Sequence, residues 1–250
     1  MDTKMNRIII FLSLLCATLS ASAQISGGTI TQTNPPGNQV ITSGALGSAG
    51  ITPSQQTRVD AWTGTMQTKN EIYIEQTGGQ NNSTTITQNG PKNKIDFTLN
   101  GNGNIVDNEQ LGSNYMKIEI PGWGNNITTS QSNNILTNYS ETKIQGNGNT
   151  VNHQQTGPGN HILFSTLAGD INNVTTTQSG AAGHYAESKL IGNWNTVKIE
   201  QSGNTQNKAS IDLTNSGGAA NLDIQQTGGK SFSIIQNCTN PAGCTTVVRQ

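Results

Sequence analysis

Apolar and polar residues alternate in short segments along most of this 250-residue chain. The alternation has a period of two residues, which predicts β-strands with one buried face, and no segment carries the periodicity of an amphipathic helix. The segments recur about every 10–14 residues with glycine and asparagine between them, a spacing typical of an all-β fold. They begin near Ile72, Thr84, Ile95, Val106, Ile118, Ile127, Thr142, Val151, Ile162, Val174, Ala186, Val197, Ala209, Leu222 and Phe232.

Two kinds of strand alternate and together define a longer repeat. One kind ends with an apolar residue before a turn, as in FTLNGNGN at 97–104 and SKLIGNWN at 188–195. The other ends with a glutamine, and these glutamines follow one another at intervals of 21 to 25 residues, with a mean of 23. They are Gln88, Gln110, Gln131, Gln155, Gln178, Gln201 and Gln226. Each repeat therefore holds two strands and two turns.

A two-strand unit cannot bury its own apolar face, so the repeats must stack on one another. In a β-solenoid, each strand pairs with its equivalent one coil away, at the cross-β spacing of about 4.7–4.8 Å. We therefore predict an all-β solenoid with two strands per coil and about seven coils over residues 70–236. Alternation then points Val197 and Ile199 inward and Lys198 and Glu200 outward.

The strand-ending glutamines share the inward parity of the apolar residues, although a buried amide without a partner costs about 1–3 kcal/mol. In a stack, each amide can donate to the carbonyl of the equivalent glutamine in the next coil, so identical residues satisfy one another. Asparagines recur six residues before five of the glutamines, which predicts a second ladder at one arc of the coil. These are Asn104, Asn125, Asn149, Asn172 and Asn195.

Glycines at a fixed place in the turns are predicted to supply the positive φ that tight arcs require. They are Gly101, Gly122, Gly146, Gly169 and Gly192. His153 shares the inward parity of Val151 and Gln155, and we interpret it as a substitute in the glutamine ladder.

The first 23 residues have the features of a secretory signal peptide. A basic start precedes an apolar run from Ile8 to Leu15, and small residues at 21–23 provide a cleavage site. The run is too short to span a bilayer. Lipidation at Cys16 would instead give a lipoprotein, but the preceding leucine is larger than such sites tolerate. We therefore expect a secreted chain.

The segments on either side of the repeats differ from them in composition. Residues 24–69, which include Pro35-Pro36, are rich in Gly, Ser and Thr, and are predicted to form a flexible leader for secretion targeting. Residues 237–250 are predicted to form a short tail. A disulfide between Cys238 and Cys244 is expected in an oxidising compartment.

Composition and charge exclude several function classes. Asn, Gln, Thr and Gly make up 46% of the chain, against 31% apolar and 11% charged residues. Globular domains average about 45–50% apolar and 25% charged residues, so a conventional enzyme core is not expected. A net charge of −1 provides no electrostatic basis for binding nucleic acid or an anionic membrane.

Candidate catalytic chemistry is sparse. The histidines are His153, His161 and His184, and the carboxylates are dispersed along the repeats at non-equivalent positions. The sequence holds no nucleophile motif, phosphate-binding loop or metal-ligand spacing. We therefore expect a protein that is not an enzyme and that binds no cofactor or metal.

The repeat resembles a known family. Asn-x5-Gln recurs at the five asparagines named above, and Gln-x4-Asn begins at Gln76, Gln88 and Gln155. With glycine in the turns and a period near 23, residues 70–236 resemble the curlin repeat of bacterial curli fibre subunits. The resemblance implies that the stacked Gln and Asn are the functional residues of a secreted subunit. Such a subunit folds as a β-solenoid while polymerising into extracellular amyloid fibres of the biofilm matrix.

The resemblance also implies partners: further copies of the chain, a nucleator subunit, a periplasmic chaperone and an outer-membrane secretion pore. One departure concerns the first strand of each repeat, where the family's common repeat has glutamine. Here the position holds Leu99, Ile120, Ile144, Leu167 and Leu190. This change bears on interchange with typical subunits and leaves polymerisation intact. A monomeric solenoid adhesin and a cell-surface nucleator remain as alternatives.

Overall fold

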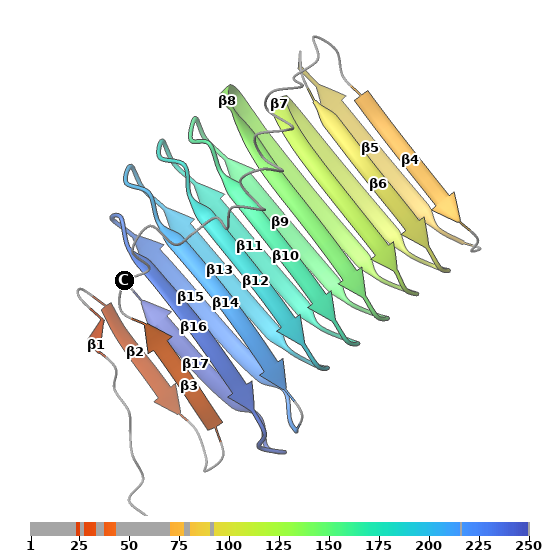
Figure 1. The fold of residues 1–250 in the computed structure, drawn as a ribbon. Helices are drawn as coiled ribbons and strands as arrows, with labels where there is room; N and C mark the ends of the chain where they lie inside the picture. The colour runs from red at the N-terminus through yellow and green to blue at the C-terminus, as the bar shows by residue number, and fades with distance from the viewer. Residues whose placement is uncertain are drawn as a thin grey trace, which may run out of the picture.

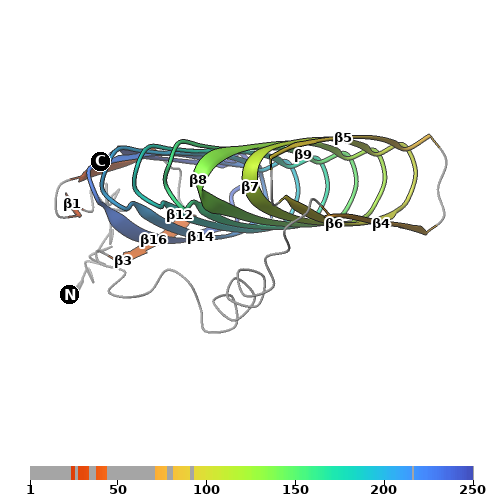
Figure 2. The same cartoon turned by 90° about the horizontal axis from the view of Figure 1, so that it is seen from above.

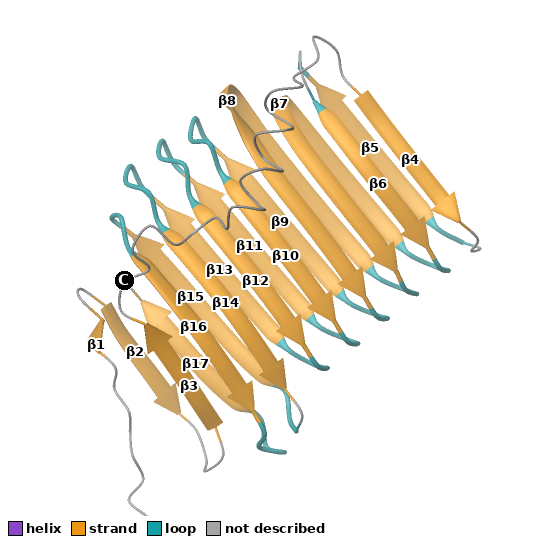
Figure 3. Ribbon diagram, viewed as in Figure 1, coloured by secondary structure: helices purple, strands orange, loops and turns teal. Residues whose placement is uncertain are grey.

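The chain is a stack of parallel β-strands. The computed structural model describes residues 24–25, 28–33, 38–43, 71–77, 81–90, 93–215 and 217–249. Within these ranges the chain forms strands and turns and no helix (Figure 3), and hence no helix long and apolar enough to cross a membrane. The predicted all-β solenoid of about seven turns is confirmed. The predicted signal peptide lies outside the described residues.

The strands follow the predicted segments. They are β1 (Gln24–Ile25), β2 (Gly28–Thr33), β3 (Asn38–Ser43), β4 (Glu71–Thr77), β5 (Ser83–Asn89), β6 (Lys94–Asn100), β7 (Ile105–Pro121), β8 (Asn126–Gln145), β9 (Thr150–Thr156), β10 (Ile162–Ala168), β11 (Asn173–Ser179), β12 (Tyr185–Ile191), β13 (Thr196–Ser202), β14 (Lys208–Asn215), β15 (Ala220–Thr227), β16 (Ser231–Cys238) and β17 (Cys244–Arg249). Every predicted segment start falls within one of them.

Each coil contributes one strand to each of two faces that lie back to back (Figure 2). The first face consists of β4, β6, the ends of β7 and β8, β10, β12, β14 and β16. The second face consists of β5, the starts of β7 and β8, β9, β11, β13, β15 and β17. β7 and β8 are long because each continues around an arc from the second face to the first.

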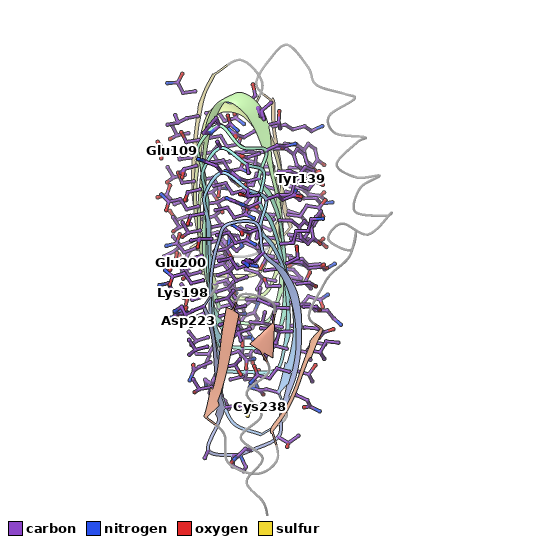
Figure 4. The ribbon with its side chains drawn as sticks, turned by 90° about the vertical axis from the view of Figure 1, so that its left-hand side faces the viewer. Glu109, Tyr139, Lys198, Glu200, Asp223 and Cys238 are labelled. Carbon is purple, nitrogen blue, oxygen red and sulfur yellow. A yellow bond between two sulfur atoms is a disulfide. The ribbon has the colours of Figure 1, made fainter. Side chains whose placement is uncertain are left out.

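Pairing between coils keeps equivalent residues in register. On the second face, Val174 pairs with Val197, and Val197 pairs with Leu222. All three side chains are buried, as the predicted inward parity requires. Seen along the rod, Lys198 and Glu200 point outward from the second face, as predicted (Figure 4). The result is a set of columns, each containing the equivalent residues of successive coils.

One inward column of the second face is polar in the middle of the rod. It contains Asn108, Thr129, His153 and Thr176, in that order, and continues as Ile199. The four polar side chains are at most 2% exposed, and their polar side-chain atoms have no hydrogen-bond partner. A hydroxyl left in this state destabilises the folded chain. The column therefore destabilises the folded chain in the four coils where it contains a polar residue instead of an apolar one.

Replacing Thr176 with valine is expected to raise the free energy of unfolding by about 1 kcal/mol, because the variant removes a buried hydroxyl that has no partner. The measurement is the urea midpoint of freshly prepared monomer. Thr175→Val, at the neighbouring outward position, is the matched control and should change the midpoint little. A lower midpoint for Thr176→Val would contradict this interpretation of the column.

The two terminal segments differ from the predictions. The expected tail contains β17, which pairs parallel with β15 and completes the last coil. Cys238 and Cys244 form a disulfide with an S–S distance of 2.10 Å, which links β16 to β17. The expected flexible leader contains β2 and β3, which pair antiparallel with β17 and β16 (Figure 1). Residues 26–27, 34–37 and 44–70 lie outside the described part.

Candidate functional site

The glutamines form one continuous ladder through the rod. In each step the Nε2 of one glutamine donates to the Oε1 of its equivalent in the next coil, over 2.7 to 2.9 Å. The ladder runs through all seven predicted residues, from Gln88 to Gln226. Gln110, Gln131, Gln155, Gln178, Gln201 and Gln226 are at most 1% exposed. Stacking thus provides partners for amides that would otherwise be buried at a cost.

A second hydrogen bond fixes the glutamine amides across the inside of the coil. The Nε2 of Gln131 also donates to the backbone carbonyl of Tyr115 at 3.0 Å, and that of Gln201 to the carbonyl of Tyr185 at 2.8 Å. The ladder therefore joins neighbouring coils and also ties the second face to the first. This cross-link was not predicted, because it depends on which strands face each other.

The predicted asparagines form a ladder in the arc through which the chain passes from the first face to the second, which we call the fixed arc. The backbone N–H of Asn149 donates to Oδ1 of Asn125 at 2.9 Å, and the Nδ2 of Asn149 donates to the carbonyl of Gly169 at 2.9 Å. The same bonds recur at Asn104, Asn125 and Asn172. Asn82 begins this ladder, and Asn195 ends it by accepting from the N–H of Ala220.

The fixed-arc glycines stand where the coils approach most closely. Gly101, Gly146, Gly169 and Gly192 have positive φ values between 116° and 142°, as predicted. Gly122 does not, so that prediction is wrong for this residue. A glycine is still required there, because a Cβ atom would lie 1.9 Å from the carbonyl oxygen of Gly146. Close backbone stacking therefore excludes a Cβ atom at these glycine positions.

A third ladder, which the sequence did not reveal, runs along the opposite arc, here called the variable arc. It contains Asn93 and Asn114 and then, beyond a register irregularity between β7 and β8 where Oδ1 of Asn114 has no partner, Asn138, His161, His184 and Asn207. The backbone N–H of His184 donates to Nδ1 of His161 at 3.2 Å, where an asparagine Oδ1 accepts in other coils. With Nδ1 accepting, Nε2 carries the proton and donates to the carbonyls of Thr156 and Ser179, both at 2.9 Å.

These contacts require neutral histidines, and the pKa values agree. Burial lowers the pKa of His161 to about 4 and also lowers the pKa of His184. Burial lowers the pKa of His153 to about 3. His153 points inward as expected, but it pairs with Thr129 and Thr176 and not with a glutamine. Its interpretation as a glutamine-ladder substitute is therefore wrong, because Gln155 fills the ladder in that coil.

Acid is expected to destabilise the rod through these histidines. Below pH 6.5 the unfolded chain binds a proton at His161, whereas the folded chain binds this proton only near pH 4. The free energy of unfolding therefore falls as the pH falls through this window. His161 alone accounts for about 2–3 kcal/mol between pH 6.5 and 4.5. Denaturant titrations at both pH values should show a smaller loss in His161→Asn/His184→Asn, since asparagine holds this position in other coils. An identical loss would contradict this explanation.

Charged residues lie on the outer surfaces. Figure 4 shows Glu109, Lys198, Glu200 and Asp223 pointing away from the second face. The Nζ of Lys198 lies 2.7 Å from Glu200, and Lys143 lies 3.3 Å from Glu119 on the first face. Solvent-exposed pairs of this kind contribute about 0–1 kcal/mol. They contribute little to holding the coils together.

Aromatic residues form an unpredicted stripe on the outside of the first face. Tyr115, Tyr139, Phe164 and Tyr185 follow one another along the stack, with ring centroids 4.8, 5.7 and 6.2 Å apart. They are at most 8% exposed despite their outward parity. Trp123 and Trp194 lie instead in the fixed arc and are more than half exposed. The exposed tryptophans therefore lie apart from the buried aromatic stripe.

The two ends of the rod differ. At the N-terminal end, β4 pairs with β6 and β5 pairs with β7, and no other described strand lies against either. Ile74 in β4 has inward parity but is 48% exposed. At the C-terminal end, β3 and β2 lie against β16 and β17. Described strands therefore cover the C-terminal end and leave the N-terminal coil uncovered.

Comparison with known proteins yields no matching family model, no similar protein of curated function and no similar solved structure. Among the described residues, no three His, Cys, Asp or Glu side chains gather as they would around a metal ion. The features that a function can use are therefore the ladders, the faces and the two ends.

Proposed function

We propose that this protein is a secreted structural subunit that polymerises, by templated stacking of solenoid ends, into extracellular curli-like amyloid fibres for biofilm matrix and adhesion. The observation that carries the proposal is the open N-terminal coil. Its strands have partners on one side only among the described strands, and Ile74 lies exposed at the position where the next coil would cover it. An unpaired strand edge is a template for another chain.

Stacking of this kind extends without limit. The N-terminal end of one copy meets the C-terminal end of another, and such a head-to-tail contact does not close on itself. The strands and ladders inside one copy repeat along a single axis, so each added copy continues the same pattern of backbone pairing. An unfolded incoming chain can form its coils one after another on the exposed end.

The resemblance to the curlin repeat supports the same proposal. It adds a periplasmic chaperone, an outer-membrane secretion pore and a nucleator subunit as partners, and a cell-surface location for the fibre. The secretory signal peptide expected over residues 1–23 agrees with that route. A non-enzymatic role without cofactor, metal or nucleic acid is part of the proposal.

One observation favours the second candidate, a monomeric solenoid adhesin or a surface nucleator. The C-terminal end is covered by β2 and β3, as expected for a solenoid that stays single or that ends a fibre. The two candidates differ in whether purified chains grow into fibres by themselves.

Residues 24–250, released from denaturant at neutral pH, are expected to convert after a lag into thioflavin-positive fibres. Fibre fragments should accelerate the growth, and fibre diffraction should show the strand spacing of about 4.7–4.8 Å. Elongation should be at least about tenfold slower when Gln110, Gln131, Gln155 and Gln178 are all replaced by alanine, because each change removes a ladder bond.

The matched control is Lys198→Gln/Glu200→Gln, which neutralises an outward pair and should leave elongation unchanged. Monomer that persists for days at micromolar concentration in the presence of fragments would favour the adhesin. Equal slowing by both sets of substitutions would show that elongation does not depend on the glutamine ladder.

A further inference from the structure

The cover on the C-terminal end does not continue the solenoid. Among the described strands, all pairings between coils are parallel, with one register irregularity between Gly112 and Ser113. In contrast, β3 pairs with β16, and β2 with β17, in the antiparallel direction. Figure 1 shows β2 and β3 lying beside β16 and β17 at the end of the rod. The antiparallel strands pair with the backbone edge, but they place Val40 opposite Gln236 and Gln32 opposite Thr246. Columns of identical side chains therefore stop at this end.

Two inward polar side chains at this end have no partner. Both amide atoms of Gln236 and the hydroxyl oxygen of Thr246 are buried and without a hydrogen bond, and both residues are 0% exposed. Gln131 and Gln155, buried in the middle of the rod, bond to each other at 2.7 Å. The terminal coil thus contains groups that a further parallel coil with matching residues would satisfy.

The opposite end of the chain has those matching residues. Gln236 belongs to a first-face column that has a glutamine in only one other described coil, at Gln76 in β4. Between them the column is apolar, with Leu99, Ile120, Ile144, Leu167, Leu190 and Leu213.

The column of Thr246 repeats this arrangement on the second face. Its other end is Thr84 in β5, and the residues between them are apolar. These are Val106, Ile127, Val151, Val174, Val197 and Leu222. In both columns, polar residues of the same type occur in the first and last coils only. Inside one molecule the two coils lie at opposite ends of the rod. The matching residues can therefore meet only when one copy stacks on another.

We propose that β16 and β17 are the docking surface for β4 and β5 of a second copy, and that β2 and β3 occupy this surface as a cap that the second copy displaces. The register places Gln236 beside Gln76 and Thr246 beside Thr84 of the incoming copy. This inference rests on the proposed function. It adds which residues meet where two copies join, and it identifies β2 and β3 as a segment of the same chain that competes with the second copy for this surface.

The chain is long enough to cap its own end. β3 lies at the C-terminal end of the rod and β4 begins the N-terminal end, so the 27 residues at 44–70 connect the two ends. Eight strand steps separate β4 from β3 and span about 38 Å at the strand spacing, whereas 27 residues reach up to about 90 Å. A tethered cap has a high local concentration, so it competes well against a free second copy when the protein is dilute.

Locking the cap tests the inference. Ile41 in β3 is the register partner of Ile235 in β16, whose side chain is 51% exposed. Directly opposed positions on antiparallel strands are close enough for a disulfide. In Ile41→Cys/Ile235→Cys, the oxidised chain should not sustain growth on fragments of wild-type fibres. At a substoichiometric ratio it should also stop wild-type growth, because a locked copy can add through its N-terminal end and then offers no new docking surface.

Wild-type protein under the same oxidant and reductant controls for the native disulfide, and mass spectrometry establishes the pairing. Reduction of the variant should restore growth to the wild-type rate. If wild-type chains elongate and the oxidised variant elongates equally fast, the cap is wrong and the proposed function stands. If neither wild type nor the reduced variant ever polymerises, both the function and the inference fall.

Matched substitutions test the register independently of the cap. Gln76→Leu and Gln236→Leu should each raise the critical concentration for fibre growth severalfold, because each leaves a glutamine facing a leucine across the junction. The double variant should return towards wild type, since leucine stacks on leucine throughout this column. Gln225→Leu, which is outward and exposed, is the control. Additive effects in the double variant would show that these two residues do not meet.

Discussion

The fold depends on the stacking of equivalent residues, one coil above another, in register. A chain with 31% apolar residues has little hydrophobic driving force, and its buried amides would each destabilise an ordinary core. Stacking removes that cost, because the glutamine and asparagine side chains bond to their own equivalents. It also explains the glycines of the fixed arc, where successive backbones lie too close for a Cβ atom.

The same constraint distinguishes the ends of the rod from its middle. Each inner coil has its partners above and below, whereas a terminal coil has them on one side and needs either a cap or another copy. At the C-terminal end the disulfide between Cys238 and Cys244 links the strands of the last coil, where the asparagine ladder has stopped. The paired side chains in the middle and the unpaired ones of the terminal coil, Gln236 and Thr246, therefore have one physical origin.

The sequence predicted the strands, the period and two of the three ladders, because those features recur at fixed spacing. Along the fixed arc, Asn104, Asn125, Asn149, Asn172 and Asn195 each stand six residues before a ladder glutamine, so this spacing predicts the ladder. Along the variable arc, the ladder residue follows Gln110 by four residues at Asn114 and Gln131 by seven at Asn138. The antiparallel cap of β2 and β3 has no repeat to reveal it and depends on contacts distant in sequence.

Side-chain amide hydrogen exchange, measured by NMR on isotopically labelled protein, tests the central claim most directly. In-register stacking predicts that the Nε2 protons of Gln131, Gln155 and Gln178 exchange as slowly as the backbone amides of the strands that carry them, because each donates to the next glutamine and to a backbone carbonyl. Exchange at the rate of a free glutamine amide, while the backbone stays protected, would contradict it.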